Sequence, residues 1–173
     1  AGYKIALMTT VGYGVGGNIK PQIEHMTSVP VPQLMKRLKK FHTEGAEWLV
    51  LETTSHALGQ NRVWGIPYSV AVMTNITHEH LDYHGSFERY REAKLKLFKM
   101  TTKNKKGLRT GVVNAEDPAA EVFTAVLPNS ITYGVKRGDL RAEEVKLTAS
   151  GSQFKVKSQS NKDLVLDIKV RLP

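Results

Sequence analysis

Two short apolar segments of this chain each run directly into a cluster of polar side chains. Trp48–Leu51 is followed by Glu52-Thr-Thr-Ser-His56, and Val70–Met73 is followed by residues 74–85, which contain three histidines. Short apolar runs of this kind are typical of buried strands in an open α/β sheet. Because ligands bind outside the carboxyl ends of such strands, we expect both clusters at one ligand-binding edge.

Helices are expected between or after these strands. The first runs from Pro32 to Gly45, and the second begins after Ser86, a residue that caps helix N-termini well. A further helix is expected from Asp117-Pro118, where an acid and then a proline favour a first turn. The apolar face of the first helix consists of Leu34, Met35, Leu38 and Phe41.

Further strands are expected at Lys4–Met8 and Thr110–Val113. Strands that alternate with helices predict right-handed βαβ units, so the expected fold class is α/β with a mainly parallel sheet and flanking helices. The glycine-rich stretch Gly12–Gly17, which follows the expected strand Lys4–Met8, is predicted to be a loop. Its glycine spacing is similar to a dinucleotide-binding fingerprint, but no helical pattern follows, so phosphate binding by this loop is not favoured.

The pattern changes after Gly134, where polar and apolar residues begin to alternate. Such alternation predicts an antiparallel β meander, which we expect at one edge of the parallel sheet. The alternating segments are 145–148, 154–157 and 164–170. We therefore expect one partial domain over residues 1–173, with an α/β part at 1–134 and an antiparallel β subregion at 140–172.

The formal charge of +9 attracts anions, and nucleic acid is the first partner to consider for so basic a chain. The Lys and Arg residues are spread in short groups without interleaved aromatic residues, so we expect a solvated surface and no nucleic-acid partner. The absence of cysteine excludes disulfides and fits the cytoplasm. No transmembrane segment or signal-peptide pattern is visible, so no membrane partner is expected.

Glu52 ends the strand Trp48–Leu51, so its carboxylate should project at the ligand-binding edge. Mg²⁺ prefers oxygen ligands and usually takes one or two carboxylates together with substrate phosphates. His80 follows the next strand and is placed to join Glu52 at one ion. The alternatives are a surface acid in a salt bridge and a loop histidine, or a zinc site that uses His78 and His84 as well.

Arg62 and Gln60 follow the hydroxyl pair Thr54-Ser55 in the segment between the two strands. An arginine fork with nearby amide and hydroxyl donors suits a carboxylate or a phosphate. Lys94 shares a helical face with Tyr90, where a fully solvated lysine is unexpected. Lys94 is therefore either an amine with a role in the site or a lysine whose aliphatic stem lies along the apolar face while its ammonium reaches water.

Four linked motifs of this chain resemble the central ATPase domain of the Mur ligases. They are the run 52–62, the segment 74–85, the helix Tyr90-Arg-Glu-Ala-Lys94 and the strand end Val113-Asn-Ala-Glu-Asp-Pro118. Within the family they are most similar to the UDP-N-acetylmuramoyl-L-alanyl-D-glutamate ligases, which add the third residue of the peptidoglycan stem peptide. The resemblance covers the whole chain and implies a P-loop NTPase-like fold.

The resemblance also implies roles for individual residues. Glu52 and His80 would hold Mg²⁺, a carbamylated Lys94 would help to bind a second Mg²⁺ through its added carboxylate, and His80 and Lys94 would be catalytic. Asn75 and Asn114 would lie on the nucleotide side. The residues implied to contact the UDP-sugar dipeptide are Thr27, Thr54, Gln60 and Arg62.

The implied reaction uses ATP as cosubstrate and Mg²⁺ as cofactor. ATP phosphorylates a carboxylate of the UDP-MurNAc dipeptide, and the amine of an amino acid attacks the acyl phosphate to give an amide. Such phosphoryl transfer depends on metal ions and on positioning. The implied role is peptidoglycan precursor synthesis in the bacterial cytoplasm.

The phosphate-binding P-loop of the family, which ends in Lys-Thr, is expected upstream of Ala1, and flanking domains are expected on both sides. We therefore expect a part of a longer ligase without ligase or ATPase activity of its own. The alternatives are a ligase for folate or a lipid-linked muramoyl substrate, and a non-catalytic module that binds a sugar nucleotide or a protein partner. His25-Met26, Thr53-Thr54 and Glu79 depart from usual family residues and affect the substrate assignment most.

Overall fold

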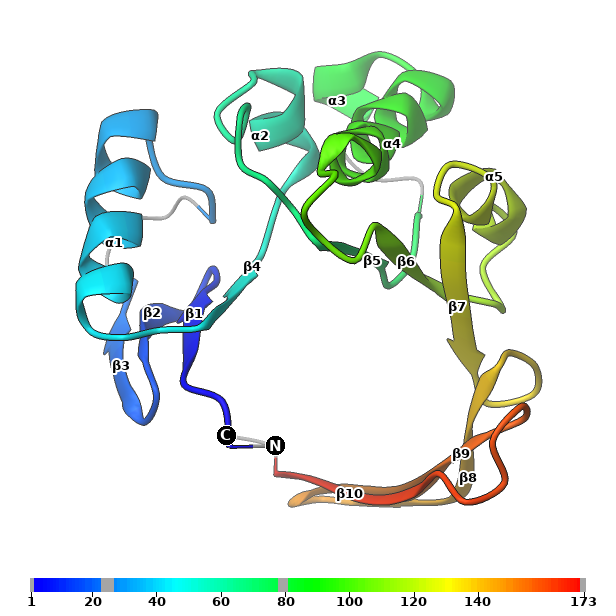
Figure 1. Ribbon diagram of the computed structural model, residues 1–173. Coiled ribbons are helices and arrows are strands. Elements are labelled where there is room, and N and C mark those ends of the chain that lie inside the picture. The colour runs from blue at the N-terminus through cyan, green and yellow to red at the C-terminus, as the bar shows by residue number, and fades with distance from the viewer. Residues whose placement is uncertain (1, 23–26, 78–80, 172–173) are drawn as a thin grey trace. The chain divides into compact units, whose positions relative to one another are not determined.

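The computed structural model describes residues 2–22, 27–77 and 81–171. The chain divides into two compact units, residues 1–66 and 67–173, and each contains its own sheet (Figure 1). Both units combine helices with parallel strand pairs, which confirms the expected α/β class. Within the described residues, no helix has both the length and the apolar character needed to cross a bilayer.

The first unit contains a four-stranded sheet in the order β3-β2-β1-β4. β1 (Ile5–Met8) pairs in parallel with β4 (Trp48–Leu51). On the other side of β1, β2 (Gly12–Val15) and β3 (Asn18–Pro21) continue the sheet in antiparallel pairs. The parallel pair places the carboxyl ends of β1 and β4 at the same edge. The helices of this unit are α1 (Val31–Thr43) and α2 (Ser55–Gly59).

The glycine-rich stretch forms a hairpin, so the prediction of a loop was wrong. Its first residues are strand β2, and Gly16 turns the chain into β3 with φ +60°. A Cβ on Gly14 would lie 2.0 Å from the carbonyl oxygen of Asn18, so only glycine permits this close approach of the two strands. A glycine-rich strand followed by a two-residue turn gives little of the apolar alternation that marks most hairpins.

The buried face of α1 differs from the expected one at two positions. Phe41 is buried as expected, but Met35 is 57% exposed and Arg37 is 8% exposed. The Arg37 guanidinium lies 3.7 Å from the centroid of the Tyr13 ring on β2. The flat, weakly hydrated guanidinium stacks on the aromatic face, and one of its terminal nitrogens donates to Gln22 Oε1 at 2.9 Å. An arginine can therefore be buried beside Leu34 and Phe41 on this face of α1.

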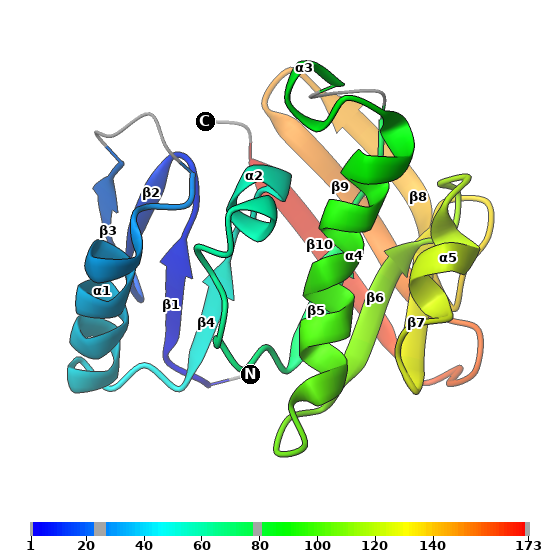
Figure 2. The same ribbon diagram turned by 90° about the horizontal axis from the view of Figure 1, so that it is seen from above.

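The second unit contains a six-stranded sheet in the order β10-β9-β8-β7-β6-β5. The first four strands pair in parallel: β5 (Val70–Met73), β6 (Thr110–Asn114), β7 (Asn129–Gly134) and β8 (Leu140–Thr148). The antiparallel strands β9 (Gly151–Ser158) and β10 (Val165–Arg171) complete the sheet. The helices are α3 (Leu81–His84), α4 (Phe87–Lys103) and α5 (Ala120–Thr124), and Figure 2 shows α4 running along β5 and β6.

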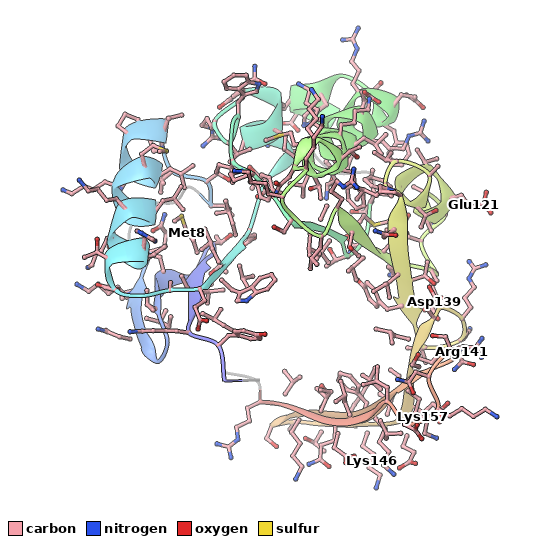
Figure 3. All side chains as sticks on the ribbon, in the orientation of Figure 1. Met8, Glu121, Asp139, Arg141, Lys146 and Lys157 are labelled. Carbon is pink, nitrogen blue, oxygen red and sulfur yellow. The ribbon has the colours of Figure 1, made fainter. Side chains whose placement is uncertain are left out.

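Strands β8 to β10 form the predicted antiparallel meander at the edge of this sheet. Phe154 pairs with Ile168 and Val156 with Leu166, whereas Lys155 pairs with Asp167. Because alternate residues of a strand point to opposite faces, this register gives one mainly apolar and one mainly polar face. Figure 3 shows Lys146 on β8 and Lys157 on β9.

Helix α4 covers the parallel strands and begins at the predicted cap. The Ser86 side chain accepts a hydrogen bond from the Arg89 amide, as expected. Phe98 of α4 contacts Phe123 of α5 edge to face, with ring centroids 5.0 Å apart. Helix α5 begins only at Ala120, later than predicted. The core of this unit consists of Ala71, Met73, Ile76, Tyr90, Leu95, Phe98, Val113, Ala119, Phe123 and Leu127.

Candidate functional site

At the edge where β1 and β4 end, three side chains of the first unit meet. Both oxygens of the Glu52 carboxylate accept hydrogen bonds from Thr10, Oε2 from the backbone amide at 2.8 Å and Oε1 from the hydroxyl at 3.0 Å. The Thr10 hydroxyl also lies 2.8 Å from the hydroxyl of Thr27. Glu52 and Thr10 are exposed and Thr27 is half-buried, so a ligand can reach all three.

These three residues meet because of the strand topology. Met8 and Leu51 are partners at the ends of the parallel pair, and the Glu52 amide donates to the Met8 carbonyl at 2.9 Å. The next residues on both strands therefore leave the sheet side by side. The prediction that Glu52 projects beyond its strand is confirmed by this register.

The donors around Glu52 suit a hard cation. One exposed carboxylate with hydroxyl oxygens beside it matches the sparse oxygen ligation of Mg²⁺, which leaves room for water and phosphate. Within residues 2–22, 27–77 and 81–171, no three His, Asp or Glu side chains gather as they would at an all-protein metal cage. His80, which was predicted to share the ion with Glu52, lies outside the described residues.

Helix α2 holds the predicted substrate residues through caps at both of its ends. The Thr54 hydroxyl caps the N-terminus by accepting from the Ala57 amide at 3.1 Å, and Gln60 is the exposed C-cap residue. Asn61 follows in the left-handed region with φ 56°, and the Arg62 amide donates to the Ala57 carbonyl at 2.9 Å. This is the Schellman pattern of helix termination, which favours glycine or asparagine at that position.

The reversal at Asn61 turns Arg62 back toward the chain segment that precedes α1. A terminal nitrogen of Arg62 donates to the Ser28 carbonyl. Two buried atoms of this pair, Arg62 Nε and Ser28 Oγ, have no hydrogen-bond partner among the described residues. An unpaired buried polar atom costs about 1–3 kcal/mol, so a polar ligand group that reached either atom would gain affinity.

In the second unit, the segment after β5 is held through its backbone. The Asn114 side-chain amide donates to the Thr74 carbonyl at 3.0 Å. The Asp117 carboxylate accepts from the Ile76 amide at 2.7 Å and from the Ala119 amide at 2.8 Å, and Asp117 is only 8% exposed. Residues from the end of β6 thus fix the backbone on both sides of Asn75, whose side chain is exposed.

Lys94 approaches the same segment from α4. Its ammonium lies 3.5 Å from the Asn75 carbonyl and 5.0 Å from the centroid of the Tyr90 ring. The side chain is half-buried. The lysine therefore lies along the ring with its nitrogen directed at the strand end. Two predicted site residues, Lys94 and Asn75, are in contact.

Glu116 ties the turn between β7 and β8 to the end of β6. Its carboxylate accepts from the Lys136 amide at 2.6 Å and the Val135 amide at 2.9 Å. These backbone bonds, that from Lys136 first, hold the pKa of Glu116 below its ordinary value of 4.5. Tyr133, on β7, has its pKa raised by burial and by the nearby Asp117 charge. Negative charge at the end of β6 is thus fixed by backbone amides.

The structure joins the predicted residues in separate groups within each unit. Glu52 and Thr27 are linked through Thr10, which the sequence reasoning did not select. Asn75 contacts Lys94, and Asn114 at the end of β6 donates to the carbonyl of the neighbouring Thr74. The residues missed from the sequence are Thr10, Glu116, Asp117 as a backbone anchor, and Ser28. Position just beyond a strand end was the one available signal, and it applied to Thr10 as well as to Glu52.

Comparisons with known proteins agree on one family. A UDP-N-acetylmuramoyl-L-alanyl-D-glutamate–2,6-diaminopimelate ligase of Geobacillus thermodenitrificans is 38% identical over 160 residues, which are 90% of this chain and 32% of that protein. The ligase of the same name from Syntrophomonas wolfei is 36% identical over 174 residues, 98% of this chain and 34% of that protein.

A solved structure of a ligase with this name superposes with a TM-score of 0.75 at 28% identity, covering 98% of this chain and 33% of that chain. The present chain thus spans about a third of the length of the relatives that it matches. The sequence model of the Mur ligase middle domain matches residues 2–173. This chain belongs to the Mur ligase middle-domain family.

Proposed function

We propose that this chain is the central part of an ATP-dependent ligase that forms an amide bond on UDP-N-acetylmuramoyl-L-alanyl-D-glutamate in peptidoglycan precursor synthesis. The observation that supports this best is the exposed Glu52 carboxylate, which Thr10 holds at the strand edge beside Thr27. The names of the relatives specify the acceptor and suggest 2,6-diaminopimelate as the added amino acid. ATP and UDP-sugars are cytoplasmic, so we place the reaction there.

In this proposal the residues divide by role. Glu52 and His80 would hold one Mg²⁺, and a carbamylated Lys94 would help to bind a second. When bound, these ions supply positive charge that stabilises the transferred phosphoryl group. Asn75 and Asn114 would contact the nucleotide. The residues proposed to hold the UDP-sugar dipeptide are Thr27, Thr54, Gln60 and Arg62. The exposed amide of Gln60 offers a donor to a substrate carboxylate or phosphate.

The test uses the full-length ligase that we propose contains this chain. With ATP, Mg²⁺, the UDP-MurNAc dipeptide and 2,6-diaminopimelate, we expect phosphate release and a UDP-MurNAc tripeptide detected by mass spectrometry. Glu52→Gln should lower kcat/KM by about 100-fold or more, since even outer partners of metal ligands cost about 10–100-fold when removed. Glu121→Gln, on the exposed side of α5, is the control and should leave activity unchanged.

Other outcomes identify the alternatives. Activity only with a folate or a lipid-linked muramoyl acceptor would reassign the substrate. Binding of the UDP-sugar without phosphate release would identify a non-catalytic module. For Lys94, ¹³CO₂ should give a carbamate ¹³C resonance that Lys94→Ala removes, and its absence from the active wild-type protein would exclude the proposed modification.

A further inference from the structure

Thr10 links the proposed metal ligand of the first unit, Glu52, to a proposed substrate-binding residue, Thr27. Through its amide and its hydroxyl it contacts both oxygens of the proposed metal ligand Glu52. Through the same hydroxyl oxygen it contacts the proposed substrate residue Thr27 at 2.8 Å. The three residues come from three segments of the chain: the residues after β1, the residues after β4 and the segment before α1.

The hydroxyl protons in this cluster can be assigned from chemistry. An ionised carboxylate only accepts hydrogen bonds, so the single hydroxyl proton of Thr10 points to Glu52 Oε1. Thr10 then has no proton left for Thr27, and the Thr27 hydroxyl must donate to Thr10. The Thr27 oxygen therefore presents only lone pairs to a ligand. Each oxygen of Glu52 also accepts only one bond from Thr10, which leaves lone pairs for a cation.

We propose that Thr10 is a positioning residue that orients the Glu52 carboxylate for a divalent cation and fixes Thr27 as a hydrogen-bond acceptor for an N–H or O–H group of the substrate. This inference rests on the proposed function. Partners that orient a metal ligand in this way tune metal affinity without touching the ion. Because Thr10 and Glu52 are exposed, water can replace their hydrogen bonds in a variant, so the fold gains little from them.

The first measurement is the affinity of the full-length ligase for Mn²⁺, a spectroscopically visible stand-in for Mg²⁺, by electron paramagnetic resonance. Thr10→Val keeps the shape and the backbone bond to Oε2 but removes the hydroxyl. We expect it to weaken Mn²⁺ binding by about 10–100-fold. Thr10→Ser restores the hydroxyl and should bind Mn²⁺ nearly as the wild type does.

The second measurement is the affinity for the UDP-MurNAc dipeptide by titration calorimetry. Thr10→Val should weaken it by about 2- to 12-fold, the effect of one misplaced hydrogen bond. The matched control is Thr43→Val, because Thr43 is also exposed and its hydroxyl donates only to the Lys39 carbonyl of α1. This control should change neither affinity. Circular dichroism and Tm verify that each variant is folded, and Thr10→Ala serves if the valine is not tolerated.

The outcomes separate this inference from the proposed function. A wild-type protein that binds neither Mn²⁺ nor the UDP-sugar dipeptide would overturn the proposed function itself. A wild-type protein that binds both, with Thr10→Val unchanged in Mn²⁺ affinity, would overturn the positioning role alone. Equal losses in Thr10→Ser and Thr10→Val would also overturn it, because the hydroxyl would then be irrelevant.

Discussion

The two units hold their candidate site residues in different ways. In residues 1–66, Glu52, Thr10 and Thr27 are joined through side-chain atoms at an accessible strand edge. In residues 67–173, the segment on both sides of Asn75 is held through its backbone, and the main anchor, Asp117, is 8% exposed. Water competes with exposed hydrogen bonds, whereas a buried backbone amide that loses its partner has no substitute.

This difference predicts that the first unit's cluster mainly affects ligand affinity and the second unit's anchors mainly affect stability. Changes in the exposed cluster of the first unit should alter ligand affinity and leave stability almost unchanged. Changes in the buried anchors of the second unit should lower stability first. The following substitutions are ordered from the largest expected effect on stability to the smallest.

Asp117→Ala should destabilise the chain by about 3 kcal/mol or more. It removes two hydrogen bonds to a charged acceptor, each worth about 1.5–3 kcal/mol, and leaves the amides of Ile76 and Ala119 without a carboxylate. Urea unfolding measures the loss. The control is Asp163→Ala on the exposed turn before β10, expected within about 0.5 kcal/mol. Equal losses in both variants would contradict the buried-anchor account.

Asn61→Val should cost about 1–2 kcal/mol, because a β-branched residue is strained at φ 56°. Asn61→Gly suits that backbone and should preserve stability. Because the reversal at Asn61 directs Arg62 toward Ser28, the valine variant should also weaken binding of the UDP-sugar dipeptide. Thermal unfolding and calorimetry measure the two effects. A valine variant as stable as the glycine variant would show that the helix ends without this conformation.

Glu116 gives the second unit a predicted sensitivity to acid. The pKa of Glu116 is lowered in the folded chain from its ordinary value of 4.5. Its negative charge therefore stabilises the fold at pH values above 4.5, and this contribution is lost as the pH falls through the lowered pKa. Glu116→Gln keeps an acceptor oxygen for the Lys136 and Val135 amides without the charge. Tm should therefore fall less steeply with pH below about 4.5 in this variant than in the wild type. Parallel Tm curves would contradict the assignment.

Thr10→Val should have the smallest effect on stability, within about 0.5 kcal/mol, as for most exposed substitutions. The same variant should have a large effect on Mn²⁺ affinity. Urea unfolding and metal titration on one preparation test both statements. A stability loss as large as that of Asp117→Ala would mean that the exposed hydrogen bonds of Thr10 contribute as much to stability as the buried ones of Asp117.

Much of the fold follows from local patterns of the sequence. The apolar runs that became β4 and β5, the Ser86 cap of α4 and the alternation of the meander are all decided within a few neighbouring residues. The hairpin of β2 and β3 was missed because its glycines are required by the distance to a neighbouring strand. Such a distance exists only after folding.

Less of the candidate site than of the fold could be predicted, because the site depends more on contacts between distant segments. Glu52 was identified because it ends an apolar run, and this depends on the chain around it alone. The roles of Thr10 and Asp117 depend on which atoms of distant segments come within hydrogen-bond distance. Thr54 was selected as a substrate residue, and the structure shows that its hydroxyl also caps α2.

An anomalous diffraction map of the full-length ligase crystallised with Mn²⁺ would show directly whether Thr10 orients Glu52 for a metal ion. We expect a peak on the Glu52 carboxylate, with the Thr10 hydroxyl still hydrogen-bonded to that carboxylate and Thr27 hydrogen-bonded to Thr10. A metal peak away from Glu52, or a Thr10 side chain turned away from a metal-bound Glu52, would contradict this expectation.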